Sequence, residues 1–64
     1  MNWHRYSPEI LESEGGLFRI YRQHLADNKG MRYTLHQLHE GIMTRLGQFE
    51  TAQHAQQAAE DYLP

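Results

Sequence analysis

The stretch Met31-Arg32-Tyr33-Thr34-Leu35-His36 alternates apolar and polar side chains with a period of two. Successive side chains of a β-strand point to opposite faces of its sheet, so Met31, Tyr33 and Leu35 would share one face. The polar side chains would share the other face: Arg32, Thr34 and His36. The alternation therefore predicts a strand that buries its apolar face and leaves its polar face open.

Runs on both sides of this stretch predict further strands. Residues 17–23 are rich in the aromatic and β-branched types that favour strands. Residues 42–49 form a weaker run, in which Gly47 suggests a bulge or a close backbone approach. A short strand around Glu9–Ser13 would pair with the run 17–23 across Gly15-Gly16. Glycine-bearing turn clusters separate the runs as hairpins require: 13–16, 27–30 and 39–41.

The clearest helix signal follows Thr51, a residue type that favours the N-cap position. Alanine and larger apolar residues come after it at helical spacing and form one stripe: Ala52, Ala55, Ala59, Tyr62 and Leu63. Glutamine and glutamate occupy the opposite side. The small side chains of the stripe permit a close approach to the surface beneath, and the pattern predicts a helix over about residues 51–62.

These elements predict the α+β fold class. We expect a single small domain over residues 1–64, with an antiparallel sheet of three or four strands followed by one C-terminal helix. A rival interpretation takes residues 31–46 as a helix, which would make the protein a mostly α-helical hairpin. Its apolar residues recur at helical intervals: Met31, Leu35, Leu38, Ile42 and Leu46. Gly41 in mid-helix and the β-favouring Tyr33-Thr34 pair favour the sheet.

The composition excludes several classes of site. The 64 residues include no cysteine, which excludes disulfides, thiolate zinc sites and cysteine nucleophiles. That usage fits a reducing compartment, and we expect a cytoplasmic protein. No apolar run approaches the ~20 residues of a membrane span, and the N-terminus lacks the apolar stretch of a signal peptide. We therefore expect no membrane partner.

Five histidines are the most unusual feature of the chain. His36 and His39 stand three apart, a spacing that could place two zinc ligands on one face of a helix. On a strand they would point to opposite faces, so we expect no metal site and no cofactor. The serines lack a nucleophile motif, and Gly15-Gly16 is an ordinary turn signal rather than a phosphate-binding loop. We therefore expect no catalytic residues and no enzyme.

The charges divide between two parts of the chain. Residues 17–45 carry five Lys and Arg against two Asp and Glu, a balance of +3, whereas the remainder carries one against six, a balance of −5. The sheet is therefore expected to be basic and its flanks acidic. We predict that the sheet face turned away from the helix binds a partner through five residues: Arg19, Tyr21, Arg32, His36 and Arg45. Arginine with aromatic side chains suits an acidic protein surface or a nucleic-acid backbone.

The run from Leu46 to Ala59 carries a resemblance to known proteins. It combines a strand closing on Leu-Gly-x-Phe, a threonine cap and an alanine-rich helix. In this it resembles small bacterial and phage proteins built as a β-meander followed by one helix. Residues 46–59 also resemble the endings of AP2-type plant DNA-binding domains and of the arm-binding domains of tyrosine recombinases. The resemblance implies the same fold, although the acidic balance of this chain departs from the DNA-binding families.

The leading hypothesis is a non-enzymatic protein-interaction module that docks through its basic, aromatic sheet face. The alternative is a small DNA-binding module that uses the same face. The acidic flanks favour the first, because they would repel phosphates within a Debye length of about 8–10 Å. Trp3 and Tyr6 are expected to pack on the sheet edge or on a second subunit, which makes a homodimer a further expected partner.

Overall fold

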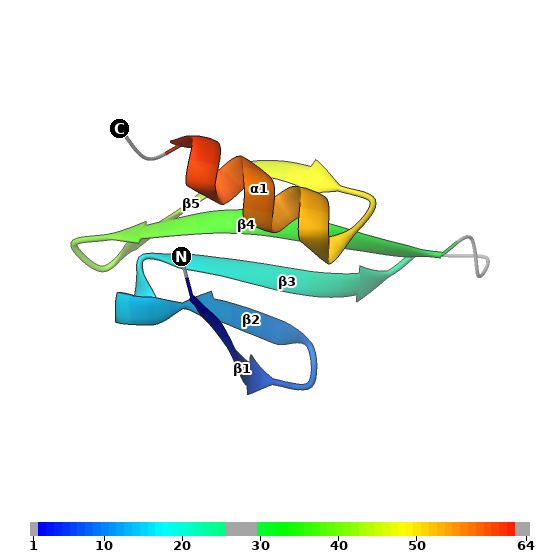
Figure 1. Cartoon of the computed structure of the whole chain (residues 1–64), viewed down its shortest axis with the longest axis horizontal. Helices are drawn as coiled ribbons and strands as arrows, with labels where there is room; N and C mark the ends of the chain where they lie inside the picture. Colours follow the sequence, from blue (N-terminus) through cyan, green and yellow to red (C-terminus); the bar gives the residue numbers. More distant parts are fainter. Residues whose placement is uncertain (1, 26–29, 63–64) are drawn as a thin grey trace.

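The computed structural model describes residues 2–25 and 30–62, and over these it has a five-stranded antiparallel sheet and one α-helix (Figure 1). The strand order follows the sequence, so every strand pairs with its neighbours along the chain. The strands are β1 (Trp3–Ser7), β2 (Ile10–Ser13), β3 (Phe18–His24), β4 (Met31–His39) and β5 (Ile42–Phe49). A short 3-10 turn, η1 (Glu14–Gly16), joins β2 to β3, and helix α1 (Ala52–Tyr62) follows β5.

The predicted α+β class is confirmed, with an antiparallel sheet followed by a C-terminal helix. The predicted count of three or four strands is wrong, because Trp3–Ser7 forms a strand that pairs with β2. This edge strand is only half-covered, so its sequence does not show the alternation of a strand with one buried face. The α-hairpin interpretation is also wrong, since residues 31–46 belong to β4, a tight turn and β5.

Glycine and glutamate make the turn between β4 and β5. His39 pairs with Ile42, so the turn has two central residues, Glu40 and Gly41, with φ angles of 53° and 80°. Two positive φ angles are those of a type I′ turn, whose twist matches the twist of the flanking strands. The turn predicted at 39–41 is thus confirmed, whereas the cluster predicted at 27–30 falls mostly outside the described residues.

The core lies between the sheet and α1. Phe18, Ile20 and Leu35 from the sheet are at most 1% exposed, as are Ala55 and Ala59 of the helix. Alanine side chains let the helix axis lie close to the strands, as the stripe predicts. Partly buried side chains extend this core, including Trp3, Leu11, Tyr33, Leu46 and Phe49. The expectation that Trp3 packs on the sheet edge is therefore confirmed.

Thr51 fixes the start of α1. Its side-chain Oγ1 accepts a hydrogen bond of 3.0 Å from the backbone N–H of His54, which is otherwise one of the unpaired donors of the first turn. The observed helix, Ala52–Tyr62, agrees with the expected one. Its far end packs through Tyr62, whose ring meets Phe18 edge to face with 6.2 Å between centroids.

A bulge in β5 decides which of its side chains face the helix. Leu35 pairs with Gly47 but His36 pairs with Arg45, which leaves Leu46 without an opposite residue. The extra residue resets the alternation, so Leu46 and Phe49 both pack against the core. A Cβ at Gly47 would lie 3.4 Å from the ring of Phe49. The sequence expectation of a bulge or close approach at Gly47 is confirmed.

Candidate binding face

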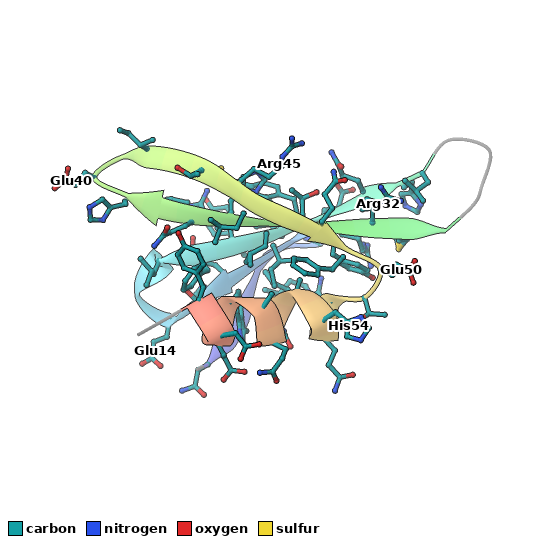
Figure 2. The ribbon with its side chains drawn as sticks, turned by 90° about the horizontal axis from the view of Figure 1, so that it is seen from above. Glu14, Arg32, Glu40, Arg45, Glu50 and His54 are labelled. Carbon is teal, nitrogen blue, oxygen red and sulfur yellow. The ribbon has the colours of Figure 1, made fainter. Side chains whose placement is uncertain are left out.

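The sheet face opposite α1, called the open face below, is uncovered over the described residues. Cross-strand partners share a face, so the pairing register lists its residues in rows. The first row crosses all five strands: His4, Glu12, Arg19, His36 and Arg45. The second row is Ile10, Tyr21, Thr34 and Gln48, and the third is Gln23 and Arg32. The structure thus brings the five predicted binding residues together: Arg19, Tyr21, Arg32, His36 and Arg45. Figure 2 shows Arg32 and Arg45 projecting away from the helix.

Arg19 is held by neighbours on the open face. Its Nε lies 2.8 Å from Oε2 of Glu12, a carboxylate only 15% exposed, and His4 Nε2 lies 3.4 Å from the other oxygen of that carboxylate. The ring of Tyr6 lies under the guanidinium, with 4.7 Å from Cζ to the ring centroid. Hydrogen bonding to Tyr21 first, and to Glu12 second, raises the pKa of Arg19.

This pairing corrects the expectation of a uniformly basic face. Glu12 belongs by sequence to an acidic flank of the sheet, but the β2–β3 register places it opposite Arg19. The charge of Arg19 is therefore matched within the chain. Arg32 and Arg45 differ, because no described carboxylate lies within 4.0 Å of either guanidinium. Arg32 Nη1 instead donates a long hydrogen bond of 3.4 Å to Oε1 of Gln48.

His36 lies at the centre of the open face. Its ring meets the ring of Tyr21 edge to face, with 5.0 Å between centroids and an interplanar angle of 87°. Its Nδ1 is buried and has no hydrogen-bond partner among the described residues. Burial, and next the positive charge of Arg45, lower the pKa of His36 below its ordinary value of 6.5. The imidazole is therefore neutral at neutral pH.

Around His36 the open face is hollowed. The hollow has a volume of about 520 Å³, and nine residues line it: Glu9, Tyr21, Arg22, Gln23, Thr34, His36, Met43, Arg45 and Gln48. Thr34 is only 5% exposed although no helix covers it, because it stands between its cross-strand neighbours Tyr21 and Gln48. The hydroxyl of Tyr21 lies 3.8 Å from Sδ of Met43. The hollow thus combines an apolar side, polar groups, two arginines and one glutamate.

The two sides of the molecule differ in charge. Helix α1 contains Glu60 and Asp61 and no lysine or arginine. Glu14 and Glu50 also lie on the helix side of the sheet in Figure 2, although Glu50 lines a second surface hollow together with Arg32. The charge division read along the sequence is therefore only partly a division in space: Arg32 and Arg45 lie on the open face, but Glu12 lies there too, and Arg5 lies on the opposite face.

The histidine pair considered for zinc does not converge. His36 faces the hollow, while His39 ends β4 with its Nε2 3.9 Å from Oε1 of Glu40, and both of these side chains are exposed. Among the described residues, no three His, Cys, Asp or Glu side chains gather where they could hold a metal ion. Over the same residues, the chain has no helix of the length and apolarity that a membrane crossing needs.

Residues outside the predicted set also shape the open face. Gln48 joins it because the bulge at Leu46 puts it on the same side as Arg45. The bulge that Gly47 predicts also implies this position for Gln48, because a bulge shifts the alternation of the residues that follow it. Met43 lies on the open face because it stands two residues before Arg45 on the same strand. The predicted pairing of a strand around Glu9–Ser13 with residues 17–23 is confirmed, but the position of Glu12 opposite Arg19 needed the exact register. Tyr6 lies in β1, which the sequence did not predict.

Comparison of the chain with protein-family models, with curated proteins and with solved structures finds no match. The resemblance of residues 46–59 to known endings therefore stays an interpretation of the sequence. Function has to be inferred from the geometry of the open face.

Proposed function

We propose that this protein is a non-enzymatic interaction module that binds a partner protein through the open face of its sheet. One observation carries the proposal: Arg32 and Arg45 have no described carboxylate within 4.0 Å and lie on one uncovered sheet face, where Arg45 lines a hollow together with Tyr21. Arginine and tyrosine are the types most often found as binding hot spots, because both combine apolar area with directed polar groups.

Exposed apolar side chains support the same face. Tyr6 is 58% exposed and Met43 is 41% exposed, and they flank the arginine row from β1 and β5. Apolar area beside unpaired cations is what a protein interface needs, since the apolar part contributes affinity and the cations select the partner. An acidic surface with apolar side chains is the matching partner.

The edges of the sheet are less suited to docking than its face. Both edge strands carry an irregularity in their pairing, near Tyr6 in β1 and at Leu46 in β5. Bulges twist an edge strand and interrupt its free row of backbone groups, which discourages the addition of another strand. The face between the two edges has no such protection.

A different protein fits the open face better than a second copy does. Two open faces brought together would oppose Arg32 and Arg45 of both chains, and like charges across an interface weaken it. The carboxylate of Glu12 is already engaged by Arg19.

Cytoplasmic location is part of the proposal, and the absence of cysteine supports it.

DNA binding is the second candidate, and the observation that favours it is the gathering of Arg19, Arg32 and Arg45 on one uncovered sheet face. Against it, Glu12 neutralises Arg19, and the number of phosphates neutralised sets the affinity of such complexes. Binding of duplex DNA that falls steeply between about 50 and 200 mM salt would favour this candidate, with a log–log slope of about −0.9 per phosphate contacted.

Capture from a host lysate, with and without nuclease, tests the proposal. We expect the intact chain to retain a partner after nuclease treatment and Arg32→Ala to retain much less. Arg5→Ala is the matched control: it removes the same charge from the opposite face, since Arg5 pairs with Leu11. Capture that nuclease abolishes would support DNA binding. Equal losses in the two variants would exclude the open face as the binding surface.

A further inference from the structure

We propose that the hollow of the open face is an anchor pocket for the carboxylate of a partner's aspartate or glutamate side chain, with an apolar residue beside it. This inference rests on the function proposed above and names the chemistry that the face selects. The groups that would contact this ligand belong to one part of the lining: Tyr21, Thr34, His36, Met43, Arg45 and Gln48. The lining also includes Glu9, Arg22 and Gln23, so its one carboxylate is outnumbered by two arginines.

Arg45 supplies the charge that a carboxylate needs. No described carboxylate lies within 4.0 Å of its guanidinium, whereas the neighbouring Arg19 is paired with Glu12 at 2.8 Å. Guanidinium and carboxylate can form two parallel hydrogen bonds, which adds orientation to attraction. An incoming carboxylate would therefore find its counter-charge at Arg45 rather than at Arg19.

Gln48 and Arg32 extend the donor set. The carboxamide oxygen of Gln48 accepts a hydrogen bond from Arg32, so the amide nitrogen of Gln48 is left as the donor of that side chain. Arg32 adds a second positive charge next to the hollow without being part of its lining. Thr34 contributes a hydroxyl between Tyr21 and Gln48. Apart from Glu9, the one carboxylate in the lining, these groups are mostly donors, which favours an acceptor-only ligand such as a carboxylate.

The other side of the pocket is apolar. The ring of Tyr21 packs against His36, and its hydroxyl lies beside the thioether of Met43. An apolar residue next to the acidic one would cover Tyr21 and Met43 and keep water from the ion pair. Exclusion of water strengthens a charge-assisted hydrogen bond, because solvent screening falls with the local dielectric constant.

His36 provides a readout of the charge in the pocket. Arg45 on β5 and Arg19 on β3 flank it in the same row, with Glu12 and His4 beyond Arg19 and Tyr21 against its ring. Burial and Arg45 lower its pKa. A carboxylate bound at Arg45 would offset that positive charge, so the pKa of His36 should rise on binding.

Selection of random peptides on phage against the full chain tests the inference. Enriched peptides are synthesised with an amidated C-terminus, which leaves side chains as their carboxylates, and each acidic residue is replaced by its amide. We expect an Asp or Glu beside an apolar residue, and about a ten- to hundredfold loss of affinity on replacement by Asn or Gln. This comparison needs no protein variant, so it holds even if a variant fails to fold.

Protein variants then locate the contact. Arg45→Gln should cause a loss similar to that of the amide peptide, and the two losses should not add, because both remove one interaction. Arg5→Ala should bind as the intact chain does. The pKa of His36, followed by NMR, should rise with the acidic peptide and not with its amide counterpart.

Two results would overturn the inference, and only the second would also count against the proposed function. Peptides that lose affinity with Arg32→Ala but tolerate the amide replacement would leave the open face as the binding surface and exclude the carboxylate anchor. Selection that enriches no peptide dependent on an open-face residue would count against both the anchor and the proposed function.

Discussion

The two faces of the sheet are built from the same strands and serve different ends. On β3, Phe18 and Ile20 face the helix and are at most 1% exposed, whereas Arg19 and Tyr21 face the open side. Neighbours in sequence thus belong to different surfaces. The helix-covered face stabilises the fold, and the open face offers charge and aromatic area to a partner.

Their difference shows how a chain of 64 residues can keep a binding surface. A core this small has little stability to lose, so nearly every large apolar residue of the sheet centre lies under α1. The open face then carries polar and charged residues that contribute little to the core. We expect the effects of substitution to separate along this division.

The largest effect is expected at the centre of the helix-covered face. Phe18→Ala removes a ring that is fully buried and meets Tyr62, which should cost about 3–5 kcal/mol. A single core in a domain of this size supplies roughly 3–5 kcal/mol, so the variant should be largely unfolded. NMR signal dispersion and near-ultraviolet circular dichroism will show this. A Phe18→Ala protein that melts cooperatively near the temperature of the intact chain would contradict the core assignment.

A smaller loss is expected where the helix begins. Thr51→Ala removes the hydrogen bond to the His54 amide and should cost about 1 kcal/mol. Thr51→Ser is the control, since serine keeps the accepting oxygen. Urea midpoints of the three proteins give the comparison. The cap would be unimportant if alanine and serine proved equally stable.

Acid should weaken the fold through His36. Its pKa is lowered in the folded chain, so the unfolded chain binds more protons as the pH falls, and stability must fall with it. The contribution is fully present above the unfolded pKa of about 6.5 and is lost as the pH falls through the folded value. Urea unfolding of the intact chain and His36→Gln at about pH 7.5 and 5 measures it. The intact chain should show the steeper loss, and equal slopes would remove His36 as the cause.

The smallest stability effect is expected on the open face. Arg32→Ala should change the free energy of unfolding by no more than about 0.5 kcal/mol, because the side chain is exposed and makes one long hydrogen bond. Urea unfolding of the intact chain and Arg32→Ala, with Arg5→Ala as the control, measures this change in the free energy of unfolding. A loss several times larger would mean that Arg32 stabilises the fold and that the division between the faces is incomplete.

Local signals predicted much of this fold. The alternation from Met31 to Leu35, the Gly41 turn and the Thr51 cap each act over a few residues, so the sequence shows them directly. β1 was not predicted, because an edge strand that is only half-covered needs no alternation of apolar and polar residues. Residues of the open face were predictable where one strand's alternation settled them, as for Arg19 and Tyr21.

Features that depend on pairing between strands could not be predicted. The ion pair of Glu12 with Arg19 follows from the β2–β3 register, which the geometry of the turn Glu14–Gly16 sets. Gln48 lies on the same face of the sheet as Arg45 only because of the bulge at Leu46. The hollow itself needs three strands in register, so no single run of sequence contains it.

The most direct test of the separation between the two faces measures two quantities on one preparation of Arg45→Ala: the free energy of unfolding and the affinity for a selected acidic peptide. The free energy of unfolding should stay within about 0.5 kcal/mol of the intact chain, while the affinity falls at least about tenfold. Parallel losses of stability and affinity would contradict the account, since Arg45 would then be part of the fold. Unchanged affinity would contradict it as well, because the open face would then bind without its central cation.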